Sequence, residues 1–243
     1  MAERDGPHWV RVLKSGSIYE VYRYSKPVCW GYSSRGGRKV GHSEGLGRAK
    51  VLGRMRAQIR RLALANFDNR SRFVTLTFAR NVTDLDEANG EFKRFIQRMR
   101  YRFGEFRYMA VIEFQKRGAV HYHVMTDWPF VRQSELGQIW GQGYVKVNRI
   151  DRVDNVGAYM VKYMTKDLSD DRLKGRKAYL LSKGLNHPRL YRGVEARAVL
   201  KALEGKEVVF SRRYTTEYQG NTVYEEYNLR RVSQANVGVE SEA

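Results

Sequence analysis

Three side chains of the kinds that bind metal ions lie close together within residues 111–125. Glu113 precedes an expected turn at residues 116–118, and His121 and His123 follow it. Strand side chains alternate between faces, so both histidines point the same way, and a hairpin about this turn sets Glu113 opposite His121. The other face is apolar and consists of Ala110, Ile112, Phe114, Val120, Tyr122 and Val124. The stretch therefore predicts a hairpin with a core face and a face that can hold a metal.

A second group of reactive side chains follows in residues 156–167. It contains two tyrosines one helical turn apart, each followed three residues later by a lysine. If the stretch is a helix, these residues share an arc about 100° wide, opposite an apolar side. They are Tyr159, Lys162, Tyr163 and Lys166. The alternative is an amphipathic helix whose tyrosines and lysines simply reach solvent.

Together the two groups indicate chemistry on a phosphodiester. A tyrosine hydroxyl is a weak nucleophile near pH 7, because its ordinary pKa is about 10. Nearby ammonium groups favour the phenolate, and a divalent cation polarises the phosphoryl oxygen. Two imidazoles and one carboxylate leave coordination positions open for phosphate oxygens. Attack by tyrosine would join the protein to one end of the broken strand, so a free hydroxyl can later reseal it.

The joint pattern resembles the HUH endonucleases, and among them the two-tyrosine rolling-circle replication initiators of small phages and plasmids. The matching motif is Glu113-x7-His121-x-His123 followed by Tyr159-x2-Lys162-Tyr163-x2-Lys166. Residues 73–78 resemble the first motif strand of that family, and residues 182–185 resemble a segment that often follows the tyrosine helix. The similarity covers roughly residues 46–190. The histidines precede the tyrosines, as in replication initiators and unlike conjugative relaxases.

The resemblance implies a role for each motif residue. The implied ligands of Mg²⁺ or Mn²⁺ are Glu113, His121 and His123; the alternating nucleophiles are Tyr159 and Tyr163; and the phosphate or phenol contacts are Lys162 and Lys166. Each nucleophile would form a 5′-phosphotyrosyl link and release a 3′-hydroxyl for a polymerase. The Tyr-x-x-Lys frame of Tyr159 favours it as the first to attack.

Composition agrees with a polyanionic partner. The 243-residue chain has 45 Lys and Arg against 26 Asp and Glu, a net charge of +19, and an isoelectric point near 10.1. Such a surplus is typical of nucleic-acid-binding proteins. The single cysteine, Cys29, excludes an internal disulfide and fits a reducing compartment. We see no apolar run of membrane-spanning length and no secretory leader, so we expect a cytoplasmic protein.

The order of expected elements favours an α+β fold. Strands are expected at 73–78, 107–115, 119–127 and 143–148, and helices at 134–140, at 153–167 and between Thr83 or Asp84 and Gly104. These predict a central, mostly antiparallel sheet with helices on its faces, as in RRM-like and HUH replication-initiator domains, plus N- and C-terminal appendages. The expected divisions are an N-terminal hairpin and basic loop (1–45), a nicking domain (46–190), a C-terminal helix and hairpin (191–230) and a disordered tail (231–243).

The flanking regions give weaker signals. Residues 1–66 hold 14 Lys and Arg against 4 Asp and Glu, and a helix is expected at 46–65. We expect contacts with the DNA backbone from Arg48, Arg54, Arg56 and Arg117. The alternative for the first region is a solvated helix face with a loop. A tyrosine-rich hairpin at 208–229 could stack exposed bases or serve only sheet packing.

The expected partners follow from this chemistry. The chain has no Gly-x4-Gly-Lys-Ser/Thr loop, so unwinding would fall to a separate helicase, and extension of the 3′-end to a polymerase, both of the host. The expected substrate is single-stranded DNA, melted or extruded as a hairpin from an origin duplex. Two alternatives stay open: a transposase or mobilisation nuclease of the HUH class, and a non-catalytic RRM-like nucleic-acid-binding module.

Overall fold

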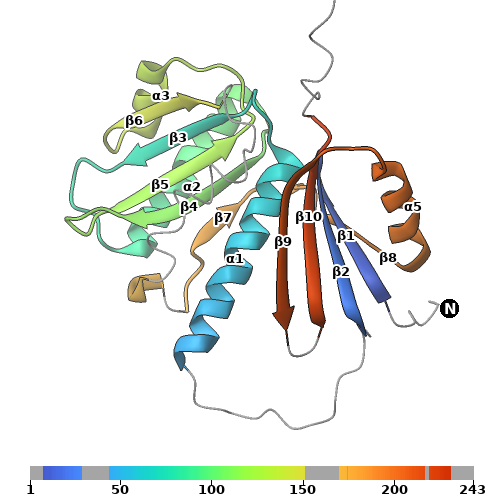
Figure 1. The fold of residues 1–243 in the computed structure, drawn as a ribbon. Helices are drawn as coiled ribbons and strands as arrows, with labels where there is room; N and C mark the ends of the chain where they lie inside the picture. Colours follow the sequence, from blue (N-terminus) through green and yellow to red (C-terminus); the bar gives the residue numbers. More distant parts are fainter. Residues whose placement is uncertain (1–7, 29–43, 151–169, 174, 217–218, 231–243) are drawn as a thin grey trace, which may run out of the picture. The chain divides into compact units, whose positions relative to one another are not determined.

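The computed structural model describes residues 8–28, 44–150, 170–173, 175–216 and 219–230. They form an α+β structure with two antiparallel five-stranded sheets (Figure 1). The chain divides into two compact units. We call residues 43–186 the central unit, and residues 1–42 with 187–243 the flanking unit. The predicted fold class, a sheet with helices on its faces, is confirmed.

The central unit contains the motif strands. Its elements are α1 (Glu44–Asn66), β3 (Arg72–Thr77), α2 (Leu85–Phe103), β4 (Tyr108–Phe114), β5 (Val120–Thr126), α3 (Gln133–Trp140), β6 (Val145–Arg149), the 3-10 helix η1 (Asp171–Leu173) and β7 (Tyr179–Leu181). The sheet order is β6-β3-β5-β4-β7. The expected strands and helices of this unit agree with these bounds to within one or two residues. The helix expected at 153–167 lies outside the described residues.

Helix α2 begins and ends where its sequence provides caps. The Asp84 carboxylate accepts hydrogen bonds from the backbone N–H groups of Asp86 (2.7 Å) and Glu87 (2.9 Å). These bonds satisfy donors that have no partner within the helix and lower the pKa of Asp84. Gly104 ends the helix with φ 78°, a conformation that glycine adopts without strain.

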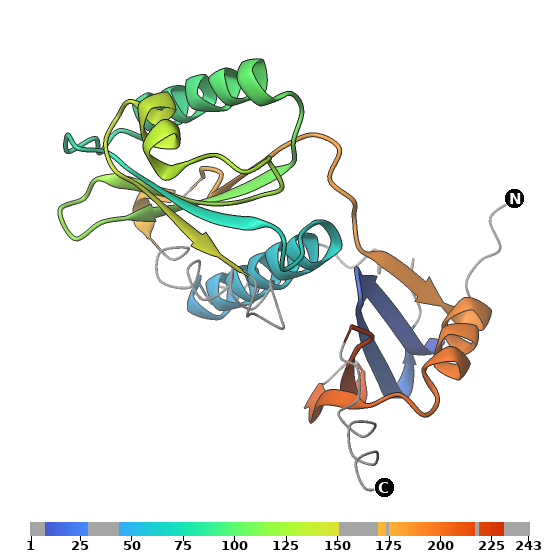
Figure 2. The same cartoon turned by 90° about the horizontal axis from the view of Figure 1, so that it is seen from above.

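The sheet of the central unit lies between helices on both of its faces. Figure 2 shows α2 and α3 on one face and α1 on the other. The apolar face predicted for the β4–β5 hairpin is confirmed, since all six of its residues are at most 7% exposed. It packs under α2, where the rings of Phe92 and Tyr122 stack 4.6 Å apart.

Helix α1 covers the opposite face with its own apolar side. Ile59, Leu62 and Ala63 are buried there and belong to the same core as Phe73. Val51, which helical spacing places on the same side, is 52% exposed. The buried part of α1 is therefore its second half. This face of the sheet carries the alternate residues of β3, β4 and β5, and with them the predicted metal ligands.

The flanking unit joins the two ends of the chain. Its elements are β1 (His8–Ser15), β2 (Ile18–Val28), β8 (Arg189–Arg192), α5 (Gly193–Leu203), β9 (Val208–Thr216) and β10 (Gly220–Asn228). The sheet order is β8-β1-β2-β10-β9, and α5 packs on it through Val12, Val21, Ala196 and Leu203. The segments expected as separate appendages, 1–45 and 191–230, thus share one sheet, because β2 pairs with β10 and β1 with β8.

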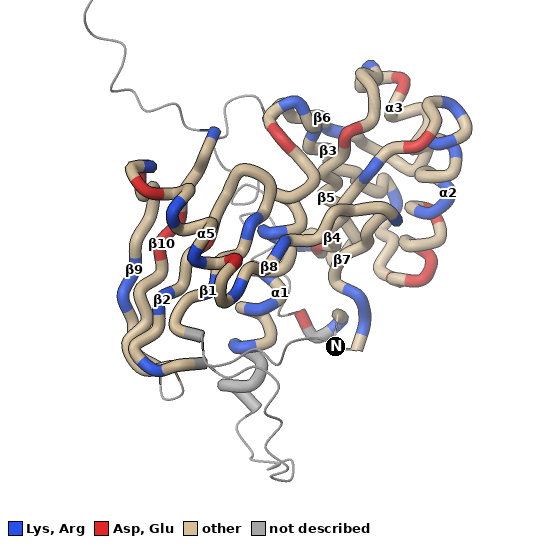
Figure 3. Tube along the Cα trace, turned by 90° about the vertical axis from the view of Figure 1, so that its right-hand side faces the viewer, with Lys and Arg blue, Asp and Glu red and all other residues tan. Residues whose placement is uncertain are grey.

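Basic residues are distributed over both units. Figure 3 shows Lys and Arg side chains on most of the described elements, with Asp and Glu interspersed. None of the described helices has the length and apolarity needed to cross a lipid bilayer.

Candidate metal centre

The hairpin of β4 and β5 brings the predicted metal ligands together. Glu113 pairs directly with His121 in the antiparallel register, and His123 lies two residues further along the same face. The turn has the expected position: Gly118, with φ 90°, donates its N–H to the carbonyl of Gln115 at 2.7 Å. A glycine in this conformation allows the short connection that sets the register.

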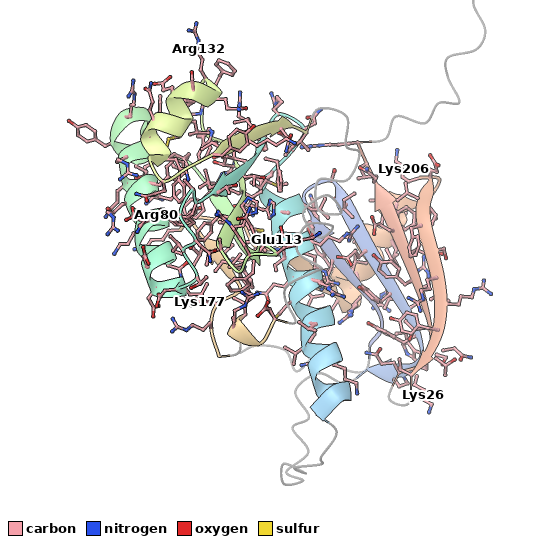
Figure 4. The ribbon with its side chains drawn as sticks, turned by 90° about the vertical axis from the view of Figure 1, so that its left-hand side faces the viewer. Lys26, Arg80, Glu113, Arg132, Lys177 and Lys206 are labelled. Atoms are coloured by element: carbon pink, nitrogen blue, oxygen red, sulfur yellow. The ribbon has the colours of Figure 1, made fainter. Side chains whose placement is uncertain are left out.

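The three side chains form a compact cluster. One ligand atom from each of Glu113, His121 and His123 lies within 4.8 Å of the other two. The Nε2 atom of His123 is hydrogen-bonded to a carboxylate oxygen of Glu113. The side chain of His123 is 7% exposed and that of Glu113 is 23% exposed. Figure 4 labels Glu113 among the side chains of the central unit.

Two threonines of β3 hold the histidines from the other side. In the β3–β5 register Thr77 pairs with His121 and Thr75 pairs with His123. The Thr77 hydroxyl lies 2.7 Å from Nε2 of His121, and the Thr75 hydroxyl lies 3.2 Å from Nδ1 of His123. Each hydroxyl engages one ring nitrogen, and the other ring nitrogen stays available as a ligand. Sequence reasoning identifies residues 73–78 only as a motif strand; the alternation of Thr75 and Thr77 is the signal for this role.

Packing also fixes the rings. The Phe73 ring stacks on His123 at a centroid distance of 5.5 Å and an interplanar angle of 15°. The rings of His121 and His123 lie 5.0 Å apart. Because Phe73 is fully buried, the His123 ring has little freedom to turn. The cluster is thus pre-organised by the core beneath it.

Electrostatics favour a neutral His121. Burial, followed by the neighbouring His123, lowers the pKa of His121 to about 4, against an opposing effect of Glu113. Its imidazole therefore carries a free electron pair at neutral pH, which is the form that binds metals.

The donor set fits a divalent cation. Two imidazole nitrogens and one carboxylate oxygen suit Mn²⁺, Zn²⁺ or Fe²⁺, and a site that holds Mg²⁺ would add oxygen ligands from water or phosphate. A neutral His121 and a carboxylate held against His123 satisfy the requirement for deprotonated ligands. The group could hold a metal ion, and its three protein ligands would leave positions open for a substrate.

The predicted nucleophiles and their lysines, Tyr159, Lys162, Tyr163 and Lys166, lie outside the described residues. The chain is described immediately before and after them. Ile150, after β6, is fully buried in the central core. Beyond the segment, the Arg172 guanidinium lies 3.6 Å from the ring centroid of Phe114, and it donates to the carbonyl of Gly118 at 3.4 Å. The chain therefore returns at the turn of the hairpin that carries Glu113 and His121.

The arginines expected to contact DNA differ in their surroundings. Arg54 is exposed on α1, Arg56 is half-buried, and the side chain of Arg48 lies outside the described residues. Arg117 is exposed but donates to the backbone carbonyls of Phe78 and Ala79 and to Gln115. Its first visible role is to tie the hairpin turn to the chain after β3. DNA contacts by these arginines stay a prediction.

Comparison with known proteins supports a role in replication. No curated protein sequence and no solved structure matches the chain. A family model described as replication-associated protein ORF2 matches residues 71–168. The matched range lies within the central unit and contains the whole metal cluster. The chain is therefore similar to replication-associated proteins of the ORF2 family over the segment that carries its candidate site.

Proposed function

We propose that the chain is a rolling-circle replication initiator that nicks and rejoins single-stranded DNA by metal-assisted attack of tyrosine. The observation that carries the proposal is the cross-strand pairing of Glu113 with His121 beside His123, within the range that matches replication-associated proteins. A cation at this cluster would polarise the scissile phosphate and offset the charge that develops on it.

In the proposed reaction, the phenol oxygen of Tyr159 or Tyr163 attacks the phosphorus atom. A new tyrosine–phosphorus ester forms, and the bond from phosphorus to the 3′-oxygen of the neighbouring nucleotide breaks. The phenol gives up its proton to solvent, and the departing 3′-oxygen takes one up, so the number of phosphoester bonds is conserved. Lys162 and Lys166 stabilise the phenolate or contact the phosphate. A 3′-hydroxyl attacking the same ester reverses the step and reseals the strand.

Several described features support this assignment. The chain enters and leaves the segment that carries both tyrosines within the central unit, at Ile150 and at Asp170, and Asp170 pairs with Arg172 beside the hairpin turn. Two nucleophiles suit a cycle in which one tyrosine starts replication and the other receives the strand at termination. Other tyrosines of the unit are poor nucleophiles; burial raises the pKa of Tyr122, whose hydroxyl donates to Asn89.

The test is formation of a covalent adduct. The protein is incubated with Mn²⁺ and single-stranded DNA from the replicon that carries its gene, and the products are run on a denaturing gel. We expect an adduct that chelator abolishes and that the double variant Tyr159→Phe/Tyr163→Phe cannot form. Chelator sensitivity separates a nuclease from an RRM-like binding module, which would not respond to it.

Tyr179 provides a matched control. It pairs with Val111, which in turn pairs with His123, so it occupies the same cross-strand row as the metal cluster. Tyr179→Phe is expected to form the adduct like the wild type. An adduct that persists in the double variant, or disappears in Tyr179→Phe alone, would refute the assignment of the nucleophiles.

A further inference from the structure

Strand β6 forms one edge of the central sheet and has two unlike faces. It pairs with β3 and is the outermost strand on that side. Val145 is buried and Val147 half-buried, on the face that α3 covers. The alternate residues point the other way; we call Tyr144, Lys146 and Asn148 the edge strip.

The register places the edge strip on the same face as the metal cluster. Lys146 pairs with Thr75, which pairs with His123. One step along, the Thr77 N–H donates to the Tyr144 carbonyl at 2.9 Å, which continues the ladder toward His121. The strip therefore lies two strand spacings, about 10 Å, from the histidines.

The strip is held firmly but its side chains face solvent. Tyr144 is 62% exposed and Lys146 is exposed. Just before them, Gly143 lies so close to the chain after β3 that an added Cβ would be 2.4 Å from the backbone nitrogen of Ala79. Ala79 also donates its N–H to the carbonyl of Gln142 at 2.8 Å. The position of the Tyr144 backbone is thus fixed, and its ring is presented to solvent.

An exposed ring and an ammonium group on one sheet face match the chemistry of single-stranded nucleic acid. Unpaired bases stack on aromatic rings, and backbone phosphates pair with cationic side chains. Base pairing within a duplex hides the faces of its bases, so an exposed tyrosine favours a single strand. The distance to the cluster suits neighbouring nucleotides of one bound strand.

We propose that the edge strip binds single-stranded DNA next to the metal cluster, with Tyr144 stacking on a base and Lys146 contacting a phosphate. The strip would hold nucleotides that flank the scissile phosphate, and in this it rests on the proposed function. It would align the strand before the cation and the tyrosines act.

The test measures binding without cleavage. A fluorescein-labelled oligothymidylate is titrated with the protein in chelator, and affinity is read from fluorescence anisotropy. We expect Tyr144→Ala to weaken binding at least about fivefold and Tyr144→Phe to retain it, because stacking needs the ring and not the hydroxyl. We expect Lys146→Ala to reduce the slope of log affinity against log salt by about 0.7, and Lys146→Arg to preserve it.

Matched controls come from the opposite side of the sheet. Tyr101 is 97% exposed on α2, and Lys93 is exposed on the same helix. Tyr101→Ala and Lys93→Ala are expected to bind like the wild type. Circular dichroism melting curves show that each variant is folded.

Three results would overturn the inference: no binding of the oligonucleotide by the wild type, equal losses in Tyr144→Ala and Tyr101→Ala, or an equal loss on duplex DNA. The adduct assay separates this inference from the proposed function. Normal adduct formation with unchanged affinity in Tyr144→Ala rejects the strip alone. A selective loss of affinity, in a protein that never forms an adduct, rejects the nicking chemistry and leaves the strip as a DNA-binding surface.

Discussion

The hydroxyl of Thr77 should control how well His121 binds a metal. It lies 2.7 Å from Nε2 of His121, on the strand that pairs with β5. Thr77→Val keeps the branched side chain that suits a strand and removes only the hydrogen bond. The His121 ring then loses the group that sets its orientation and tautomer.

The expected loss can be estimated from hydrogen bonds of this kind. Removing a group that orients a metal-binding histidine typically costs 10- to 100-fold in metal affinity, which corresponds to about 1.4–2.8 kcal/mol. The contact of Thr75 with His123 is longer, at 3.2 Å, and Phe73 also restrains that ring. We therefore expect a smaller loss in Thr75→Val, of about tenfold or less.

Calorimetric titration with Mn²⁺ checks the prediction. Thr83→Val serves as the control, because Thr83 is exposed ahead of α2 and does not contact the cluster. Melting curves in chelator show whether a variant has lost stability rather than affinity. If Thr77→Val binds Mn²⁺ as tightly as the wild type while folded, the hydroxyl does not position His121 and this reasoning is wrong.

Three further predictions follow from the same geometry. Gly143→Ala should lower the free energy of unfolding by about 1–3 kcal/mol, because its Cβ would lie 2.4 Å from backbone atoms at the end of β3, whereas Gly137→Ala, which meets nothing within 4 Å, should be neutral or stabilising; urea denaturation of both variants checks this. Tyr122→Phe should cost about 1 kcal/mol by removing its 2.8 Å hydrogen bond to Asn89 and leave Mn²⁺ affinity unchanged, since the ring lies on the other face; a loss of affinity would contradict the assignment of faces. Glu113→Gln should keep the fold and lose Mn²⁺ binding at concentrations that saturate the wild type, and equal binding in a titration would remove the carboxylate from the ligand set.

Local sequence was sufficient for the hairpin and its cluster. Alternation with a period of two separated His121 and His123 from the apolar residues, and a short turn with Gly118 left one register that pairs Glu113 with His121. The caps of α2 were equally readable, because Asp84 and Gly104 act on backbone groups within a few residues.

Pairing between distant strands could not be read in the same way. Nothing near Thr77 in the sequence shows that it lies beside His121, since the β3–β5 register depends on residues 44 positions apart. The joining of the chain ends in the flanking unit has the same cause, because β2 and β10 are about 200 residues apart and either could have paired locally. Arg117 illustrates a third limit: its charge predicted a DNA contact, while its guanidinium donates to carbonyl groups after β3.

The central claim is that one divalent cation binds where Glu113, His121 and His123 converge. Anomalous diffraction from crystals grown with Mn²⁺ tests it directly, because the ion is located without reference to activity. We predict one strong peak per chain in contact with all three side chains. A peak elsewhere, or density showing Glu113 still bonded to His123 at saturating Mn²⁺, would contradict the account.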